Sequence, residues 1–327
     1  MNKILITGIT GQDGIFLTEK ILSSYPEAKI YGISRSYNYQ GLYQKIQFLN
    51  KKINLDNIEI LNIDLKIYED VNNIIKNIKP AYLYNLMGPS SVSNSIGNDI
   101  YYQENLENSF ENIVKSVIKN NIKTKIFQAS SSEMFANSEK KLDENSKFLP
   151  RSPYSKSKLY IHNKIQFYRE EEGLNICSGI MFNHESEFRP DSFLLMKIVS
   201  KAIDIKKNKI NKIKVGSLDY VRDWSFAKDI MDAAYLITEQ DYLQDYVLGS
   251  GKGTKIQQIL EYVFSSLDLV WTDFVEIDDS ILRKDDPISI ISNPIKIKND
   301  LDWQTTHSFE NVLDRMINFQ TNTDQEL

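Results

Sequence analysis

The chain has 327 residues, of which 41% are hydrophobic and 25% are charged, so it can bury a sizeable core, and disorder, a small disulfide-stapled fold and a fold built only of repeats are excluded. The formal net charge is -5, from 39 Lys and Arg against 44 Asp and Glu with interleaved signs, which argues against nucleic acid as the main partner. The single Cys177 excludes an intramolecular disulfide, and no apolar run approaches the roughly 20 residues of a membrane span, so we expect a cytoplasmic protein with no membrane partner.

Short apolar segments alternate with longer, helix-like segments over the first half of the chain. The apolar segments, each too short for a helix, lie at 3–7, 29–34, 58–63, 81–86, 124–129 and 175–182. Segments with apolar residues at three- and four-residue spacings lie at 13–24, 66–77, 98–120 and 153–172. This alternation predicts an α/β fold with a Rossmann-like, doubly wound parallel sheet.

The regular alternation ends near residue 183. A polar stretch, a helix-like segment at 193–206 and a basic segment at 206–215 follow, and the elements after them are mixed. We therefore predict a main domain over residues 1–182, with a return segment near 225–250, and a smaller C-terminal substrate-binding region over 183–327.

Three glycines, Gly8, Gly11 and Gly14, follow the first predicted strand with the spacing GxxGxxG and lead into a predicted helix. Such a turn allows close backbone approach to a pyrophosphate, and the free N–H groups of the helix N-terminus attract the anion. Placed between a strand and a helix, the turn predicts a dinucleotide-binding site that includes Gln12 and Asp13.

The ends of the next strands supply the other candidate cofactor contacts. The second strand ends at Ser34-Arg35-Ser36, where no acid is present for a ribose hydroxyl; Arg35 favours NADP, with an exposed loop arginine and use of NAD as alternatives. Asp64 and Leu65 follow the third strand and are candidate adenine contacts, although Asp64 could equally cap the next helix. Leu86, at the end of the fourth strand, completes this set.

Tyr154 and Lys158 form a YxxxK motif on a predicted helix, one turn apart on the same face. A lysine ammonium beside a phenol favours the phenolate and lowers the tyrosine pKa from about 10, which makes the tyrosine a general base for an alcohol. Alone, the motif is more typical of a solvated helix face. Downstream of the glycine turn it indicates a catalytic pair.

The segment Gln128-Ala-Ser-Ser-Ser-Glu133 ends the fifth predicted strand. The carboxyl ends of strands in a doubly wound sheet face the ligand crevice, so Ser131 and Glu133 are expected near Tyr154. The alternatives are loop capping for the serines and a helix N-terminal carboxylate for Glu133.

These residues resemble the extended short-chain dehydrogenase/reductase family, and within it the GDP-mannose 4,6-dehydratase branch. The resemblance spans nearly the whole chain. Its motifs are GITGQDG at 8–14, YNL at 84–86, QASSSE at 128–133, PRSPY at 150–154, FNHES at 182–186, LDYVRDW at 218–224 and the pair Arg283 and Asp286.

The resemblance implies a reaction through a 4-keto sugar with internal hydride return. Tyr154 would deprotonate the C4 hydroxyl, Ser131, in place of a family threonine, would hydrogen-bond that oxygen, and Lys158 would hold the cofactor ribose. Glu133 would remove the C5 proton and then protonate the leaving C6 hydroxyl. The implied substrate contacts are Ser91, Asn183, Lys197, Arg222, Arg283 and Asp286, the last in place of a family glutamate.

The segment Leu86-Met-Gly-Pro-Ser-Ser91-Val departs from the family's LAAQSHV around the nicotinamide and the sugar. The resemblance implies a GDP-sugar substrate, and this departure leaves open whether the sugar is mannose, another hexose or a heptose. The alternatives are a GDP-sugar C4 dehydrogenase, 4-reductase or epimerase of the same fold, and a Rossmann-like binding or regulatory subunit. The family also implies a homodimer through the helices at 98–120 and 153–172, or a homotetramer that uses residues 37–51. No metal site is expected.

Overall fold

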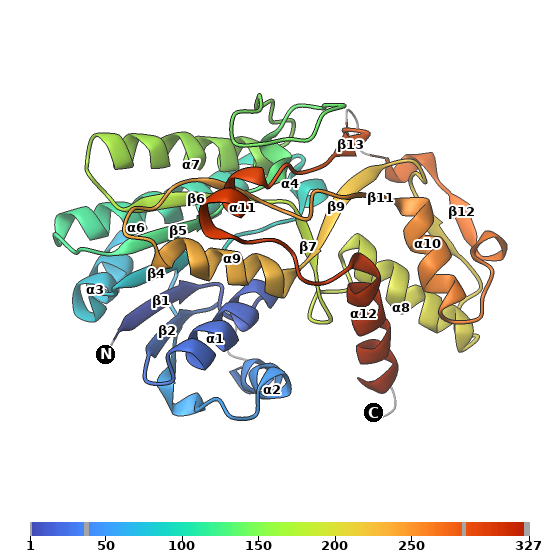
Figure 1. The fold of residues 1–327 in the computed structure, drawn as a ribbon, viewed down its shortest axis with the longest axis horizontal. Coiled ribbons are helices and arrows are strands. Elements are labelled where there is room, and N and C mark those ends of the chain that lie inside the picture. Colours follow the sequence, from blue (N-terminus) through green and yellow to red (C-terminus); the bar gives the residue numbers. More distant parts are fainter. Residues whose placement is uncertain (1, 36–38, 283–285, 324–327) are drawn as a thin grey trace. The chain divides into compact units, whose positions relative to one another are not determined.

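The computed structural model describes residues 2–35, 39–282 and 286–323 (Figure 1). These residues form two compact units, each assembled from segments that are separate in the sequence. The first unit comprises Met1–Phe135, Phe148–Met181 and Met231–Tyr246, and the second comprises Ala136–Lys147, Phe182–Ile230 and Val247–Leu327. Within the described ranges, no helix is both long enough and apolar enough to cross a membrane.

A seven-stranded sheet has the order β10-β6-β5-β4-β1-β2-β3, in which the pairs from β3 to β6 are parallel, and its strands β1 to β6 belong to the first unit. The strands are β1 (Lys3–Thr7), β2 (Lys29–Ile33), β3 (Ile58–Leu61), β4 (Tyr82–Asn85), β5 (Lys125–Ala129), β6 (Ile176–Met181) and β10 (Tyr246–Leu248). The order reverses beside β1, as in a doubly wound sheet. The predicted Rossmann-like α/β fold and its six strands are confirmed.

Helices connect these strands (Figure 1). They are α1 (Gln12–Ser24), α2 (Tyr39–Leu49), α3 (Tyr68–Ile78), α4 (Val92–Ser95), α5 (Asp99–Gln103), α6 (Ser109–Lys119), α7 (Pro153–Glu170) and α9 (Ala227–Glu239), with short 3₁₀ turns at Leu55–Asn57 and Ser132–Met134. The helix predicted at 98–120 is present as α5 and α6, joined by a π-helical turn at Glu104–Asn108.

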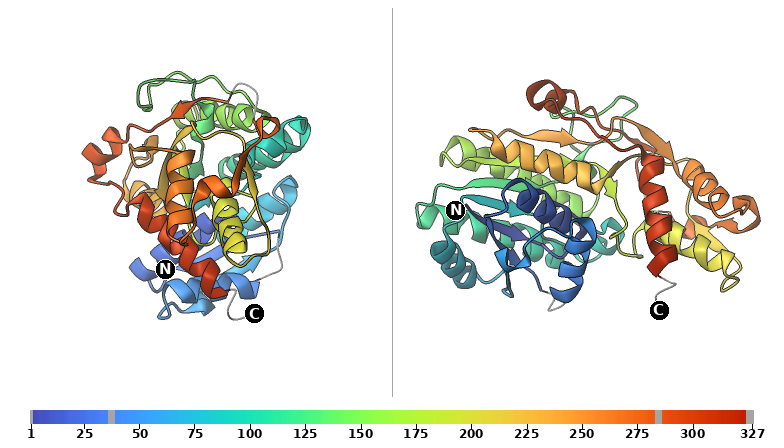
Figure 2. Two further views of the ribbon diagram at one scale, coloured as in Figure 1. Left: turned by 90° about the vertical axis from the view of Figure 1, so that its right-hand side faces the viewer. Right: turned by 60° about the horizontal axis from the view of Figure 1, so that its bottom comes forward.

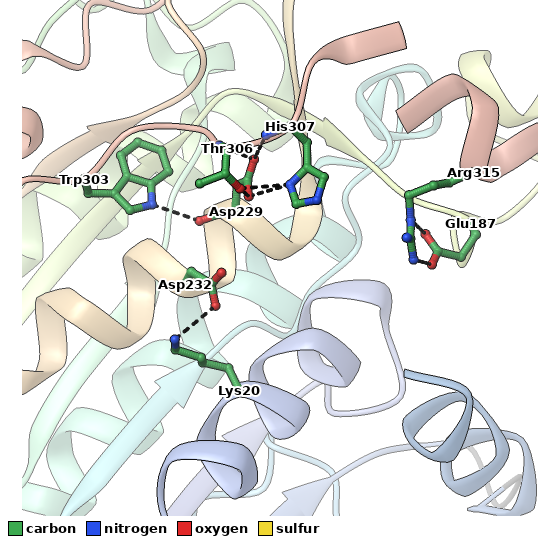
Figure 3. Close-up of polar contacts among 8 residues, drawn as sticks. All are labelled: Lys20, Glu187, Asp229, Asp232, Trp303, Thr306, His307 and Arg315. Carbon is green, nitrogen blue, oxygen red and sulfur yellow. Dashed lines mark hydrogen bonds and ion pairs between the residues drawn. The ribbon is translucent and has the colours of Figure 1, made fainter. Parts of the chain in front are cut away.

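A hydrophobic core on one face of the sheet holds helices α6 and α7 against the strands. Leu83 and Ile126 of the strands are buried in one cluster with Phe110 and Val114 of α6 and Ile161 of α7. Away from this cluster, polar contacts join α1 to α9: Tyr25 donates a hydrogen bond to Glu239 at 2.7 Å, and the Lys20 ammonium lies 3.7 Å from the Asp232 carboxylate (Figure 3).

A chain of buried polar side chains crosses the carboxyl ends of three neighbouring strands. Thr7 on β1 donates to the Asn85 side chain on β4 at 2.6 Å, and Asn85 donates to the Gln128 side chain on β5 at 2.7 Å. Gln128 in turn donates to the Ala129 carbonyl at 2.8 Å. Because each buried group has a partner, these bonds fix the edge from which the candidate catalytic loop leaves β5.

The second unit contains a four-stranded and a two-stranded sheet. In the first, β9 (Val221–Phe226) pairs with β7 (Asn183–Glu185), β11 (Gly253–Lys255) and β13 (Ser289–Ile290); in the second, β8 (Ile213–Val215) pairs with β12 (Val275–Ile277). The helices are α8 (Leu194–Lys206), as predicted, α10 (Ile256–Ser265), α11 (Ile295–Leu301) and α12 (Phe309–Thr323), and 3₁₀ turns lie at Trp271–Asp273 and Asp279–Ile281.

The C-terminal helix α12 lies beside α8 (Figure 2), and buried carboxylates hold it and the segment before it. Asp229 accepts hydrogen bonds from the backbone N–H groups of Thr306 and His307 at 3.0 and 3.1 Å and from both side chains (Figure 3). Glu187, with a side chain only 1% exposed, forms an ion pair with Arg315 of α12. These contacts fasten the end of the chain to the second unit.

Candidate active site

The glycine turn lies between β1 and α1, and its packing requires glycine at two positions. Gly8 has φ +73°, and a Cβ there would lie 3.1 Å from the Met87 Cα. A Cβ on Gly14 would lie 2.5 Å from the Ile9 Cα, closer than real side chains approach. Gly11 is the N-cap of α1, and within the described residues no side-chain bond caps that helix end. The first N–H groups of α1 can therefore bind an anion.

Arg35, at the end of β2, is exposed, and its Nη1 lies 3.5 Å from Asn105 Oδ1 at the limit of a hydrogen bond. The neighbouring Ser36 lies outside the described residues. Ser34 is buried, with its hydroxyl 3.1 Å from that of Thr10 in the glycine turn. The Arg35 guanidinium is thus accessible to a phosphate.

Asp64 and Leu65 follow β3, and the structure decides between the two interpretations of Asp64. Helix α3 begins at Tyr68 with Ile67 as its N-cap, so the helix-capping alternative for Asp64 is wrong. The Asp64 carboxylate instead accepts a hydrogen bond from the Lys66 N–H at 3.0 Å in the preceding turn. Leu65 has a buried side chain in the core, so only its backbone can meet a ligand.

Tyr154 and Lys158 lie on the buried face of α7. The helix begins sharply because Ser152 and Ser155 form a capping box with Pro153 at the first position. The Lys158 ammonium lies 5.7 Å from the centroid of the Tyr154 ring, and the two residues are 6% and 7% exposed. Burial lowers the pKa of Lys158 from 10.5 to about 8, and the Asp13 carboxylate in the glycine turn acts in the opposite direction.

A hydrogen bond connects this helix to the end of β5. Lys158 Nζ donates to the Ala129 carbonyl at 2.8 Å, and Ser131 and Glu133 follow Ala129 directly. The buried Ser131 caps the 3₁₀ turn, accepting a hydrogen bond from the Glu133 N–H at 3.2 Å, as the capping alternative predicted. Its own O–H remains a donor. Glu133 is half-buried. One unit therefore brings together a phenol, an ammonium, a hydroxyl and a carboxylate.

The candidate substrate contacts belong to both units. Ser91, in the first unit, caps α4 and accepts a hydrogen bond from the Asn94 N–H at 3.2 Å. In the second unit, Asn183 lies half-buried on β7. Arg222 on β9 lies 3.2 Å from the Asp286 carboxylate, and both side chains are buried. Arg283 lies outside the described residues.

Lys197 is exposed on α8 and lines a cavity of about 200 Å³ together with Asp191, Lys201 and Asp204. In the part of the chain that the structure describes, no carboxylate forms an ion pair with its ammonium. Lysines of the basic segment at 206–215, by contrast, do form ion pairs with carboxylates. Lys206, Lys212 and Lys214 pair with Asp268, Glu276 and Asp278 at 3.2, 2.9 and 3.1 Å. Lys197 is therefore the better candidate for an anionic ligand.

Comparison with known proteins assigns the family. The family described as GDP-mannose 4,6 dehydratase matches residues 5–316. This chain belongs to that family. GDP-mannose 4,6 dehydratase 2 of Arabidopsis thaliana is 34% identical over 96% of this chain and 85% of its own length. The GDP-mannose 4,6 dehydratase of Dictyostelium discoideum is 29% identical over 96% of this chain and 94% of its own length. The resemblance inferred from the motifs is confirmed.

Solved structures with lower identity share the fold. The dTDP-glucose 4,6-dehydratase DesIV of Streptomyces venezuelae, with NAD and TYD bound, superposes with a TM-score of 0.86 at 16% identity, covering 99% of this chain and 98% of that one. UDP-glucose 4-epimerase of Bifidobacterium longum, in complex with NAD+ and UDP, also gives 0.86 at 16% identity with full coverage of both chains. These likenesses concern the fold of this family member and not its substrate.

The sequence analysis missed one residue at the site. The Tyr102 ring packs edge-on against the Tyr154 ring, with centroids 6.2 Å apart, and its hydroxyl donates to the Ser91 carbonyl at 2.6 Å. Tyr102 thus connects the general-base candidate to the segment that departs from the family pattern. Its only signal in the sequence is an apolar position in a predicted helix, which does not distinguish it from a core residue.

Proposed function

We propose that this chain is a GDP-hexose 4,6-dehydratase that works with a nicotinamide cofactor, NADP in preference to NAD. The family match over residues 5–316 supports the reaction class. The observation that carries the proposal is the 2.8 Å hydrogen bond from Lys158 to the Ala129 carbonyl, because it holds the YxxxK helix against the segment that bears Ser131 and Glu133.

The first unit fits a dinucleotide. The uncapped start of α1 and the close packing at Gly8 and Gly14 suit a pyrophosphate, with Gly11, Gln12 and Asp13 completing the turn. The exposed Arg35 supports a preference for the 2′-phosphate of NADP. Asp64, the Leu65 backbone and Leu86 would border the adenine and nicotinamide, and Lys158 would hold the ribose. When bound, the nicotinamide accepts a hydride from the sugar and returns it.

Tyr154 acts as the general base of the first half-reaction. Its phenolate takes the proton of the C4 hydroxyl while the bond from C4 to its hydrogen breaks, and a 4-keto sugar forms. The nearby Lys158 ammonium favours the phenolate, and the O–H of Ser131 donates to the C4 oxygen. This use of Ser131 is compatible with its capping bond, in which the oxygen is the acceptor.

Glu133 acts in the second half-reaction. The C4 ketone makes the C5 proton acidic, and the Glu133 carboxylate removes it. The protonated carboxyl then donates to the C6 hydroxyl, which leaves as water. The hydride taken from C4 would then go to C6, and Tyr154 would give C5 the proton that it took from the C4 hydroxyl, which restores both residues. The half-buried position of Glu133 supports this pair of roles, since the carboxylate is neither enclosed in the core nor fully solvated.

The second unit would bind the nucleotide end of the substrate. Lys197 suits the diphosphate because no carboxylate in the described residues pairs with it, and Arg222, Asp286 and Asn183 supply polar groups for the nucleoside. Arg283 is assigned to the same site by its motif, and Ser91 to the sugar. The single, buried Cys177 supports a cytoplasmic enzyme.

The reaction is tested by incubating the purified protein with NADP and GDP-mannose, or with other GDP-hexoses and a GDP-heptose, and measuring product mass and NADPH. Loss of one water without net NADPH supports dehydration. Stoichiometric NADPH with retention of the water would indicate a C4 dehydrogenase instead. Tyr154→Phe is the control, because any turnover that survives it does not use this site.

A further inference from the structure

Strand β9 carries two charged neighbours, Arg222 and Asp223, whose side chains point to opposite faces of the sheet. On one face, Arg222 lies 3.2 Å from the Asp286 carboxylate, and its Nη1 is 3.4 Å from the Ile288 carbonyl. Arg222 therefore holds the segment that leads into β13. Asp223 has no corresponding ion pair with a lysine or arginine within the described ranges.

The Asp223 carboxylate is 1% exposed and is surrounded by donors from two loops. Its Oδ1 accepts from the N–H and the hydroxyl of Ser250 at 2.9 and 2.5 Å. Its Oδ2 accepts from the Gly251 N–H at 2.9 Å, from the Ser292 N–H at 3.1 Å and from the Ser292 hydroxyl. A buried carboxylate without a cation is costly unless its lone pairs are filled, and here five donors fill them.

The packing around this carboxylate is tight. A Cβ on Gly249 would lie 2.5 Å from the Ser292 hydroxyl and 3.0 Å from Asp223 Oδ2, so a side chain at 249 would separate the two loops. Ser250 and Gly251 lead into β11, and Ser292 follows β13; both strands pair with β9. Asp223 thus fastens the outer strands to the central one.

We propose that Asp223 is a positioning residue for nucleotide binding. Through Ser292 it fixes the end of β13, while Arg222 fixes the beginning through Ile288 and Asp286. Together, the hydrogen bonds of Asp223 with Ser292 and the contacts of Arg222 with Ile288 and Asp286 set the position and direction of Asp286 toward the nucleotide. Asp223 itself touches no substrate. The inference rests on the proposed function, in which Arg222 and Asp286 belong to the nucleotide site.

Asp223→Asn tests this role, because the amide keeps the shape but its N–H₂ faces a backbone N–H in either orientation, that of Ser250 at one oxygen position or those of Gly251 and Ser292 at the other. A buried donor left without an acceptor weakens the arrangement, so we expect KM for the GDP-sugar and Kd for GDP to rise about tenfold or more. We expect kcat to change less than about threefold, since the chemistry lies in the first unit. NADP affinity should stay at the wild-type value, which also reports an intact first unit.

Asp219→Asn is the matched control. Asp219 lies just before β9 with a side chain 78% exposed, so the same change of charge should leave KM and Kd unaltered. If Asp223→Asn does not fold, Ser292→Ala decides: it removes one donor, and a rise of a few-fold in KM supports the role, whereas an unchanged KM overturns it.

An Asp223→Asn enzyme with wild-type KM and GDP affinity would overturn this inference and leave the proposed function unaffected. So would a fall in kcat with KM unchanged. A wild-type protein that binds no GDP and turns over no GDP-sugar would instead contradict the proposed function. GDP binding by calorimetry beside turnover therefore separates the two failures.

Discussion

Lys158 is a cation in a place that disfavours its charge. Burial lowers its pKa to about 8, while the carboxylate of Asp13 and the carbonyl of Ala129 stabilise the ammonium. The residue is thus poised to lose its proton just above neutral pH. At the scale of single residues, the proposed chemistry depends on this balance, since the ammonium favours the Tyr154 phenolate.

The pH profile follows from that value. As pH rises through about 8, Lys158 becomes neutral and kcat/KM should fall. Lys158→Arg keeps its charge at high pH, so its basic limb should move upward, although the overall rate drops because the guanidinium does not match the ammonium geometry. Profiles of kcat/KM against pH for the wild type and Lys158→Arg check this prediction. A basic limb at the same pH in both proteins would contradict the role of the Lys158 charge.

The same pKa has a consequence for stability. The unfolded lysine holds its proton up to about 10.5, whereas the folded one loses it near 8. Between these values the unfolded state binds more protons, so this group disfavours folding below pH 8, and that cost disappears as pH rises to 10.5. Raising the pH above about 8 therefore removes a cost to stability but lowers activity.

Glu133→Gln separates the two half-reactions. Glutamine cannot take the C5 proton, so dehydration should fall by about 10²–10⁴-fold, while oxidation at C4 by Tyr154 continues and NADPH accumulates. Absorbance of NADPH and product mass report the two events. Glu139→Gln, an exposed glutamate further along the chain, is the control. Full dehydration by Glu133→Gln would remove this residue from the mechanism.

At the scale of elements, contiguous motifs were predictable and contacts between distant segments were not. The glycine turn and the YxxxK pair each lie within one short stretch, so their spacing indicates geometry directly. The hydrogen bond from Lys158 to Ala129 depends on the order of β5 and α7 in space, and the ion pair between Arg222 and Asp286 depends on β9 and β13. Strands of two or three residues such as β13 have no periodicity to detect.

The π-helical turn at Glu104–Asn108 was also beyond prediction. The segment 98–120 has helical spacing throughout, and its hydrophobic pattern continues across the turn. Gly88, with φ +145°, approaches this turn so closely that a Cβ would lie 2.2 Å from Leu106 Cδ2. The irregular turn is thus part of the packing beneath the loop that follows β4, a tertiary feature that local sequence does not report.

Gly14→Ala tests the junction of β1 and α1. The new methyl group would overlap the Ile9 backbone, since the Cβ position is 2.5 Å from its Cα, so α1 must move away from the turn. We expect NADP affinity to fall by at least about tenfold and the midpoint of thermal unfolding to drop. Gly173→Ala is the comparison for strain alone, with φ +65° and no neighbour within 4 Å. Equal NADP affinity in both variants would refute this reading of the turn.

At the scale of the whole molecule, the chain divides into one unit with the proposed catalytic groups and another with the proposed nucleotide contacts. The first unit is assembled from Met1–Phe135, Phe148–Met181 and Met231–Tyr246, whereas the sequence pattern predicts residues 1–182 with a return segment near 225–250. The second recruits Ala136–Lys147, where the Leu142 N–H donates to the Ile291 carbonyl at 2.8 Å. No local pattern distinguishes that segment from an ordinary loop.

The homodimer that the family resemblance implies is also a prediction about the whole molecule. Ile100, Tyr101, Tyr160 and Phe167 expose large side chains on α5 and α7, the helices assigned to the interface. We expect light scattering to give twice the chain mass, and Phe167→Glu to shift it toward the monomer because a charge would be buried at the interface. Tyr242→Glu, at a side chain 86% exposed outside these helices, should remain dimeric. A monomeric wild-type protein would contradict the assignment.

The central claim, dehydration with internal hydride return, is tested most directly by GDP-mannose carrying deuterium at C4. The account predicts a dehydrated 4-keto product with that deuterium at C6, measured by mass spectrometry and NMR, and no net reduced cofactor. Deuterium retained at C4, or found in accumulated NADPH without loss of water, would contradict it.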